Sequence, residues 1–307
     1  MEMLHEPISL VADRGRVDVS AAAGQLGVAE DAPPMLTLGV VVLTFNSGNV
    51  IERTLRAALS VSDTVFVVDS DSTDNTVSVV RALGCQVIQR PFKNYADQRN
   101  WAIHEFGHRS LWQLHLDADE ILDAKAIAEV RRVLADPSGA TAFIFERRTY
   151  FMGRPLRFGG ATNYHLRLFK SGTACCEDRL YDQHFVSELP GVRIGGLLHD
   201  MNVGSLTEWT ARHNRWSDLE AAEICRNEAR ASGQIKARLS ADPRERRRFY
   251  KGRYYRVPPI ARAVLLFFYR YFAQGGFLDG RPGFYYAFFQ ALWFRMLVDA
   301  KLEERSS

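Results

Sequence analysis

Three carboxylates follow directly on an apolar run in the segment LWQLHLDADEIL, residues 111–122. Residues 111–116 are typical of a buried strand, and Asp117, Asp119 and Glu120 come after it. Acids crowded beside a core cost free energy unless a cation or a proton compensates them. Two carboxylates one residue apart at a strand end can share a hard divalent cation, which keeps further coordination positions for water and phosphate oxygens. The segment therefore predicts a site for a divalent cation at Asp117 and Asp119.

Two earlier apolar runs, residues 38–45 and 64–68, also end in polar side chains. The first run ends in Thr44, Phe45 and Asn46, of which Thr44 and Asn46 are polar, and Asp69 and Asp71 follow the second run. Capping of the next helix explains one acid after each strand, but not two acids one residue apart. The sequence has neither a glycine-rich phosphate loop with its lysine nor a G-x-G-x-x-G after the first run. Metal and basic side chains would therefore have to neutralise the diphosphate of a bound nucleotide.

Short strands and helices of about ten residues alternate along this part of the chain. The pattern predicts strands at 38–45, 64–68, 85–88 and 111–116 and helices at 50–59, 74–83 and 95–106. Such an alternation indicates right-handed βαβ units and an α/β fold with a mostly parallel sheet and flanking helices. Ligands bind beyond the carboxyl ends of the strands in sheets of this kind, where the polar side chains collect.

Four motifs in this order, VVVLTFN, VVDSDSTDNT, DQRNWA and LHLDADE, resemble those of the large inverting glycosyltransferase family that uses a D-x-D metal motif, glycosyltransferase family 2. The chain is similar in particular to bacterial members that build lipopolysaccharide core or exopolysaccharide, from about Leu36 to the C-terminus. The resemblance implies a GT-A (nucleotide-diphospho-sugar transferase) fold, a nucleotide-diphosphate sugar as donor, and Mg²⁺ or Mn²⁺ as cofactor.

The same resemblance implies roles for the residues of the motifs. Asp119 would be the direct metal ligand, and Asp117 would lie near the ribose and the metal. The donor-binding set would be Thr44, Phe45, Asn46, Asp69, Asp71, Arg99, Asn100 and Asp117. For Arg99 and Asn100 the alternative is a solvated helix face.

Inversion by a single displacement needs a base on the acceptor hydroxyl, opposite the departing diphosphate. The segment CCEDRLYDQHF contains an E-D pair of the kind from which the family often supplies this base. The resemblance favours Asp178 as the base, with Glu177 supporting it, and leaves Asp182 and Glu188 as competing choices. His184 would bind the diphosphate or the acceptor, or would have a structural role instead.

The segment RHNRW, residues 212–216, resembles the Q-x-x-R-W motif of polymer-forming relatives, but Arg212 stands in place of the glutamine. Arg215 can pair with a diphosphate through two parallel hydrogen bonds. Trp216 offers an aromatic face for an acceptor sugar ring. An ordinary amphipathic helix is the alternative interpretation.

The 307 residues are enough for one large domain or two small ones, and the formal charge of +3 is too small to indicate nucleic acid. We expect a flexible leader over residues 1–35, a GT-A domain over 36–220, and a basic, amphipathic helical region at the membrane interface over 221–307. The first ten residues lack the pattern of a secretory signal. The four cysteines have no zinc or redox spacing, which favours reduced thiols in a cytosolic protein.

Residues 226–256 contain eleven Lys or Arg against three acids, and two apolar runs rich in aromatic residues follow. Arg262 and Arg270 interrupt the first run, and the second, residues 282–294, is shorter than the roughly eighteen to twenty residues that a bilayer needs. The pattern favours helices in the headgroup plane beside anionic lipid. Helices that merely cover the core are the alternative, and no nucleic-acid-binding motif is present.

These features predict a peripheral protein on the cytoplasmic face of the inner membrane, or in the cytoplasm, that acts on a lipid-linked saccharide and not on nucleic acid. A transferase that loads the sugar directly onto polyprenyl phosphate is the nearest alternative. A non-catalytic, membrane-associated scaffold is the alternative from another class, and the intact acids at 117, 119 and 178 argue against it. A nucleotidyltransferase would have a glycine-rich first loop, which TFNSGN is not.

Overall fold

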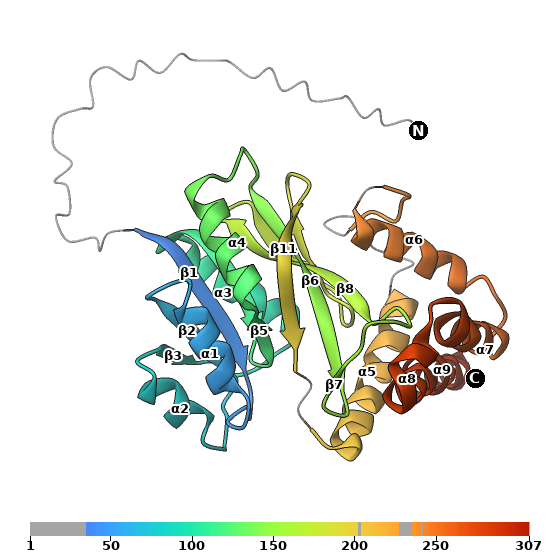
Figure 1. Ribbon diagram of the computed structural model, residues 1–307. Helices are drawn as coiled ribbons and strands as arrows, with labels where there is room; N and C mark the ends of the chain where they lie inside the picture. Colours follow the sequence, from blue (N-terminus) through green and yellow to red (C-terminus); the bar gives the residue numbers. More distant parts are fainter. Residues whose placement is uncertain (1–34, 202–203, 227–234, 241, 307) are drawn as a thin grey trace, which may run out of the picture. The chain divides into compact units, whose positions relative to one another are not determined.

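The computed structural model describes residues 35–306 except 202–203, 227–234 and 241 (Figure 1). The leader predicted for residues 1–35 therefore lies outside the described residues, apart from Met35. Met35–Ser307 is one compact unit. The domain boundary predicted at residue 220 falls inside a continuous helix, α5 (Leu206–Arg226).

The first half of the chain forms a parallel sheet with the strand order β3-β2-β1-β4. Its strands and helices occupy the predicted segments: β1 (Leu36–Thr44), α1 (Ile51–Leu59), β2 (Val65–Asp69), α2 (Thr76–Ala82), β3 (Gln86–Gln89), α3 (Tyr95–Gly107) and β4 (Ser110–Asp117). β1 and β2 are β-branched runs, which is the composition expected of strands buried on both faces. The register pairs Thr44 with Asp69 and Leu43 with Asp117, so the three polar strand ends meet at one edge.

The second half of the sheet is mixed. β8 (Thr162–Lys170) is antiparallel to β4 and to β6 (Ala142–Phe151), while β11 (Val192–Asp200) is parallel to β6. β5 (Glu120–Leu122) pairs with β11 in antiparallel orientation and sets Glu120 opposite Asp200. The remaining elements are β7 (Arg154–Pro155), α4 (Ala124–Ala135) and the ribbon of β9 (Ala174–Cys176) and β10 (Phe185–Ser187). The parallel sheet that the sequence predicts is thus confirmed for the first four strands.

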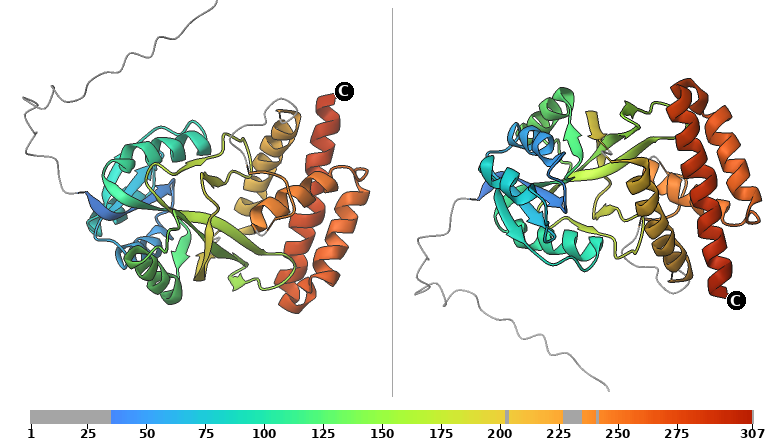
Figure 2. Two further views of the ribbon diagram at one scale, coloured as in Figure 1. Left: turned by 90° about the horizontal axis from the view of Figure 1, so that it is seen from above. Right: turned by 90° about the horizontal axis from the view of Figure 1, so that it is seen from below.

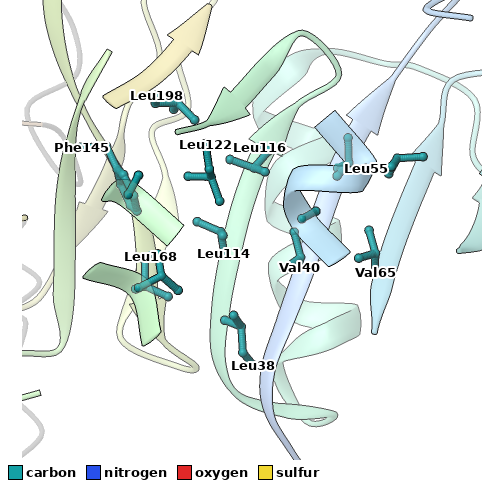
Figure 3. Close-up of a cluster of buried hydrophobic side chains, with 14 of the residues drawn as sticks. Leu38, Val40, Leu55, Val65, Leu114, Leu116, Leu122, Phe145, Leu168 and Leu198 are labelled. Carbon is teal, nitrogen blue, oxygen red and sulfur yellow. The ribbon is translucent and has the colours of Figure 1, made fainter. Parts of the chain in front are cut away.

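The core lies on both faces of the sheet because inward-facing side chains alternate along each strand. Leu38, Val40 and Val42 of β1 pack with residues of α1 and α4 on one face, in the cluster shown in Figure 3. Val41 and Leu43 of the same strand pack against α3 on the other face. The sheet is therefore the middle layer of an α/β/α arrangement, and its carboxyl edge stays available for a site.

The C-terminal part is helical, as predicted. It consists of α6 (Pro243–Tyr254), α7 (Ala261–Phe268), a π-helical turn (Tyr269–Ala273), a 3₁₀ turn (Gly276–Asp279), α8 (Gly280–Ala287), a second π-helical turn (Phe288–Trp293) and α9 (Phe294–Ser306). These helices gather beside α5 (Figure 2). Trp209 of α5 contacts Phe151 at the end of β6 and Phe289 of the second π turn, which joins the helices to the sheet. Within the described part of the chain, no helix has the length and apolar character that a membrane span requires.

Candidate active site

A cavity of about 420 Å³ opens at the carboxyl ends of β1 and β4. Six of the residues singled out from the sequence line it: Thr44, Phe45, Asn46, Asp117, Asp119 and Arg212. Ser47, Asn49, Ser70, Phe92, Tyr95 and Gln98 also contribute to its wall. Strand ends supply most of this lining, and α5 supplies Arg212 from far along the sequence. The sheet thus brings together the polar groups that the parallel topology predicts.

The loop after β2 is held by side chains of the predicted donor set. Asp69 is completely buried and accepts a hydrogen bond of 2.9 Å from the backbone N–H of Ser72. Asn46, whose φ of 46° is left-handed, accepts one of 2.8 Å from the backbone N–H of Thr73. Neither Asp69 nor the exposed Asp71 lines the cavity. Asp69 therefore stabilises the shape of this loop without lining the cavity, and the loop places Ser70 at the cavity wall.

Arg99 and Asn100 also support the site without lining the cavity. Arg99 is completely buried, so the solvated helix face considered for it is excluded. Asn100 holds the backbone of Cys176 in β9 by two hydrogen bonds, one given to its carbonyl at 2.9 Å and one accepted from its N–H at 2.8 Å. Neither residue lines the cavity; Arg99 positions Asp117, and Asn100 positions β9.

Asp117 is held between two guanidinium groups. Arg99 and Arg167 both form ion pairs with its carboxylate, the second at 2.7 Å, and the hydroxyl of Tyr95 donates a hydrogen bond at 3.1 Å. Burial alone would raise the pKa of Asp117, but Arg167 and Arg99 outweigh it and hold the pKa below its usual range. The side chain keeps 27% of its surface exposed toward the cavities that it lines. Asp117 is therefore a fixed carboxylate, ionised at neutral pH.

Glu120 is the second acid with arginine partners, and it is completely buried. Arg167 forms an ion pair with it at 2.5 Å and Arg147 one at 3.5 Å, and Arg147 also reaches Asp200 at 3.5 Å. Arg147 and Arg167 lie outside the sequence motifs that predict the site. A signal was present, because Arg167 is a cation in the apolar stretch LRLF of a strand, and a buried cation requires an acid partner. Two of the three acids after β4 thus find their cations within the fold.

Asp119 differs from its neighbours. Among the described residues its carboxylate has no ion-pair or hydrogen-bond partner, although it lines the cavity and is half-buried. Burial, followed by the charges of Asp200, Asp117 and Glu120, raises the pKa of Asp119 to about 7 against a smaller opposing effect of Arg212. The site thus has negative charge that the protein does not compensate, which is what a divalent cation requires.

The donor set for such a cation is small. Within the described part of the chain, no group of three or more His, Cys, Asp and Glu side chains is arranged to hold a metal ion. Asp119, with Asp117 beside it, fits a cation that takes its remaining ligands from a bound diphosphate and from water.

A second cavity, of about 490 Å³, shares Phe92, Tyr95 and Asp117 with the first. Its other walls come from β6, β8, the segment between β9 and β10, and α5. They include Arg147, His165, Arg167, Tyr181, Asp182, His184 and Trp216. The two cavities therefore meet at Asp117, so groups bound in each of them would approach one another there.

The acids considered for the base lie in different surroundings. Asp178 is 67% exposed, forms an ion pair with Arg226 at 3.0 Å, and lines neither cavity. Glu177 is completely buried and accepts hydrogen bonds from the backbone N–H groups of His184 and Ile235. Glu188 is exposed and lines neither cavity.

Asp182 is the candidate base whose side chain lines the second cavity. Lys251 lies 3.2 Å from its carboxylate and His184 lies 3.4 Å from it. Burial raises the pKa of Asp182, but Lys251 and His184 lower it well below the usual range, so the carboxylate is ionised. Burial also lowers the pKa of His184 itself, which stacks on His165 with the ring centres 5.4 Å apart.

The RHNRW segment lies in α5 and contributes to both cavities. Arg212 lines the first cavity and its guanidinium lies 5.3 Å from the ring centre of Trp216, which lines the second. Arg215 is exposed and lines neither cavity. Arg212, which stands where the motif has glutamine, thus places a positive charge at the wall of the first cavity.

Residues 39–188 match the family model of glycosyl transferase family 2. The chain is similar to an uncharacterized glycosyltransferase of Rickettsia bellii (strain RML369-C), with 29% identity over 150 residues that cover 49% of this chain and 47% of that protein. It is similar to the uncharacterized glycosyltransferase RC0292 of Rickettsia conorii (strain ATCC VR-613 / Malish 7), with 27% identity over 150 residues that cover 49% of each chain. The chain spans about half the length of the curated relatives it matches.

Among solved structures, the chain is similar to the mannosyltransferase PcManGT from Pyrobaculum calidifontis in complex with GDP-Man and Mn²⁺. The sequence identity is 16%, the alignment covers 93% of this chain and 92% of that one, and the TM-score is 0.47. The family match and the observed sheet with its flanking and C-terminal helices confirm the predicted fold class.

Proposed function

We propose, from the premise that residues 39–188 are a glycosyl transferase family 2 domain, that this protein is a metal-dependent inverting glycosyltransferase. It would transfer a sugar from a nucleotide-diphosphate sugar to a lipid-linked saccharide of cell-envelope polysaccharide or lipopolysaccharide. The observation that carries the proposal is the pair of cavities that meet at Asp117, one with an uncompensated Asp119 and the other with the ionised Asp182.

The first cavity has the groups that a nucleotide-diphosphate sugar needs. The exposed rings of Phe45 and Phe92 give it apolar surface against which a base can pack. Asn46 and Ser70 supply polar groups for a base or ribose, and Arg212 supplies positive charge for the diphosphate.

Asp119, with Asp117, would hold Mg²⁺ or Mn²⁺ in this cavity. When bound, the ion supplies positive charge that stabilises the departing diphosphate. Arg99 and Arg167 restrain Asp117 from behind, so that its carboxylate keeps one orientation toward both cavities.

In the second cavity, Asp182 would act as the base in place of Asp178. The acceptor hydroxyl would attack the anomeric carbon as Asp182 takes its proton, and the bond from that carbon to the diphosphate oxygen would break. Attack from the cavity opposite the diphosphate inverts the anomeric configuration. Trp216 in the same cavity provides a face for the acceptor sugar.

Attachment to the cytoplasmic face of the membrane remains part of the proposal. It is supported by a group of exposed apolar side chains on α7 and the π turn after it: Leu265, Phe268, Tyr269 and Phe272. The basic segment supports it less than its composition indicates. Arg226, Arg244, Arg248 and Lys251 form ion pairs with acids of the fold.

Calorimetry with UDP and GDP, with and without Mn²⁺, tests the donor site. We expect one of the two to bind, and binding to weaken when Mn²⁺ is removed. Asp119→Asn should abolish this metal dependence and reduce transfer about 10³-fold, which is typical for loss of one charge-stabilising group. Its fold should be intact, because no described side chain pairs with Asp119.

Asp71→Asn is the matched control, since Asp71 is exposed and lies outside the cavity wall. Equal metal-dependent binding by wild type and Asp119→Asn would remove the metal assignment. Failure of wild type to bind either nucleotide would count against a uridine or guanosine donor.

A further inference from the structure

A third cavity, of about 170 Å³, lies among the C-terminal helices. Arg247 and Lys251 of α6, Arg270 of the π turn after α7, and Arg295 of α9 all line it. Tyr181 and Asp182 line this cavity as well as the second one. The third cavity therefore adjoins the candidate acceptor site at the residue proposed as the base.

The cations of this cavity outnumber its carboxylates. Lys251 pairs with Asp182 at 3.2 Å and with Glu220 at 2.8 Å, and Arg295 pairs with Glu220 at 2.8 Å. Within the described part of the chain, Arg247 and Arg270 have no carboxylate at ion-pair distance. Arg247 donates a hydrogen bond to the neutral side chain of Asn163.

Arg270 is partly buried in this basic surrounding. Burial lowers its pKa to about 10; Tyr286 opposes this effect, and the charges of Arg247 and Arg295 add to it. A guanidinium stays protonated at neutral pH even so, which makes the cavity a site of uncompensated positive charge. An anion with several oxygens satisfies such a site, because each arginine can give it parallel hydrogen bonds.

The helix and turn that supply Leu266 and Arg270 to the cavity also carry exposed apolar side chains. Leu266 lines the cavity, and Leu265, Phe268 and Phe272 on the same helix and turn are 60%, 52% and 56% exposed. A ligand with its charged group in the cavity and a hydrocarbon chain on this surface would satisfy both features at once.

We propose that the third cavity binds a phosphate group of the acceptor, and that this phosphate is carried on a lipid. Arg247 and Arg270 would contact the phosphate oxygens, while the saccharide extends into the second cavity and brings its hydroxyl to Asp182. The inference rests on the proposed function, which it makes more specific by assigning the acceptor to phosphate-bearing amphiphiles. A phosphate borne by a soluble saccharide has the same chemistry and is separated from the lipid by the experiment.

The test uses the full-length protein and three probes: inorganic phosphate, hexyl phosphate and hexyl glucoside. Calorimetry should show binding of both phosphates, tighter for hexyl phosphate, and none of the neutral glucoside. Arg247→Gln and Arg270→Gln should each weaken hexyl phosphate binding about ten- to a hundredfold, the effect of losing a hydrogen bond to a charged group.

Arg253→Gln is the matched control, because Arg253 is an exposed arginine of the same helix α6 that lies outside the cavity. It changes the net charge equally and should bind hexyl phosphate as wild type does. Arg247 is itself exposed, so its replacement does not threaten the fold even if replacement of Arg270 does.

Equal affinity for inorganic and hexyl phosphate would support the phosphate site and assign it to a soluble phosphorylated saccharide. Wild-type affinity in Arg247→Gln and Arg270→Gln, or no binding of either phosphate, would overturn the inference. Binding of UDP or GDP with Mn²⁺ is measured on the same samples. If wild type binds UDP or GDP but neither phosphate probe, this inference alone is wrong. If wild type binds neither nucleotide, the result counts against the donor site of the proposed function.

Discussion

The first cavity is the proposed donor cavity and the second is the proposed acceptor cavity, and we call the parts of the chain that build them the donor half and the acceptor half. The two cavities are built by different kinds of contact. At the donor cavity, parallel strands set the positions of Thr44 and Asp117, and Asp69 bonds to Ser72 only three residues away. At the acceptor cavity, the links are ion pairs between distant segments. Glu177 joins Arg248 across 71 residues, and Asp182 joins Lys251 across 69.

Because of this difference, the two halves depend on different features of their sequences. Backbone pairing positions the strand ends at the donor cavity, and Asp117, which both cavities share, also depends on its ion pairs with Arg99 and Arg167. The acceptor side depends on buried charges, and loss of one partner leaves the other without compensation in a poorly solvated place. We therefore expect substitution of Asp119, which has no ion-pair partner among the described residues, to leave stability unchanged, whereas substitution of Asp182 should affect both stability and turnover.

The largest effect should separate Asp182 from Asp178. Asp182→Asn should lower kcat about 10²- to 10⁴-fold, the usual contribution of a general base, while the Kd of the nucleotide diphosphate stays unchanged. Asp178→Asn should change kcat by no more than about twofold, because Asp178 is exposed and lies outside both cavities. Steady-state kinetics and calorimetry measure the two quantities.

Asp178→Asn also serves as a control for altered folding, since each of the two variants removes one negative charge from the same loop. Thermal unfolding of both proteins shows whether the Lys251 contact of Asp182 matters for stability. A fully active Asp182→Asn together with an inactive Asp178→Asn would restore the base that the sequence favours, and would place the acceptor on the exposed side of this loop.

A smaller effect, on stability, is expected at Glu220. This acid of α5 is almost completely buried, and Arg295 and Lys251 both pair with it at 2.8 Å. Burial raises the pKa of Glu220, but the two cations outweigh it and lower the pKa from 4.5 to about 2. Such a carboxylate adds about 3 kcal/mol of stability above pH 4.5, and this contribution is lost as the pH falls toward 2.

Glu220→Gln should therefore reduce the free energy of unfolding by about 3 kcal/mol at pH 7, and the difference from wild type should shrink below pH 4.5. Denaturant unfolding at pH 7 and near pH 3 measures both values. Glu52→Gln is the control from the donor half, where an exposed pair with Arg56 contributes less than about 1 kcal/mol. A pH-independent difference for Glu220→Gln would mean that its charge is not what stabilises α5 against α9.

The donor half could be predicted from sequence because its signals are local. The runs at β1, β2 and β4 have strand composition, and parallel pairing alone brings Asn46 and Asp119 to one edge. A local sequence pattern does not show which residue pairs with each charged side chain. Arg99 in DQRNWA is compatible with an exposed helix face until its ion pair with Asp117 is known.

The position of Asp182 at the second cavity could not be predicted from the sequence, for the same physical reason. Asp178 and Asp182 are four residues apart in the segment between β9 and β10, and of the two it is Asp182 that lines the second cavity. Lys251 is one of eleven basic residues in its segment, and composition does not distinguish it from Arg253 on the exposed surface. Only the packing of α6 against the loop shows that Lys251 belongs to the site.

The smallest expected effect concerns the apolar surface on α7 and its π turn. Deleting residues 257–307 would not test it, because the deletion also removes Arg295, which pairs with the buried Glu220 of α5, and the buried side chain of Phe294. The double substitution Leu265→Ser and Phe268→Ser changes exposed positions and leaves these contacts intact. Two apolar side chains that each bury about half of their surface in the membrane contribute roughly 1 kcal/mol each to membrane contact, so vesicle binding should weaken about tenfold or more.

Co-sedimentation with phosphatidylglycerol and phosphatidylcholine vesicles measures this binding, and stronger binding to the anionic vesicles would show that the basic residues contribute. Leu189→Ser is the control, since Leu189 is an exposed leucine in the loop after β10. Equal partition of wild type and the double variant would leave the apolar surface to the hydrocarbon chain of the acceptor alone. The acceptor half would then bind its substrate without contacting the membrane. A tenfold loss of vesicle binding would mean that the surface proposed for the hydrocarbon chain also contacts the membrane.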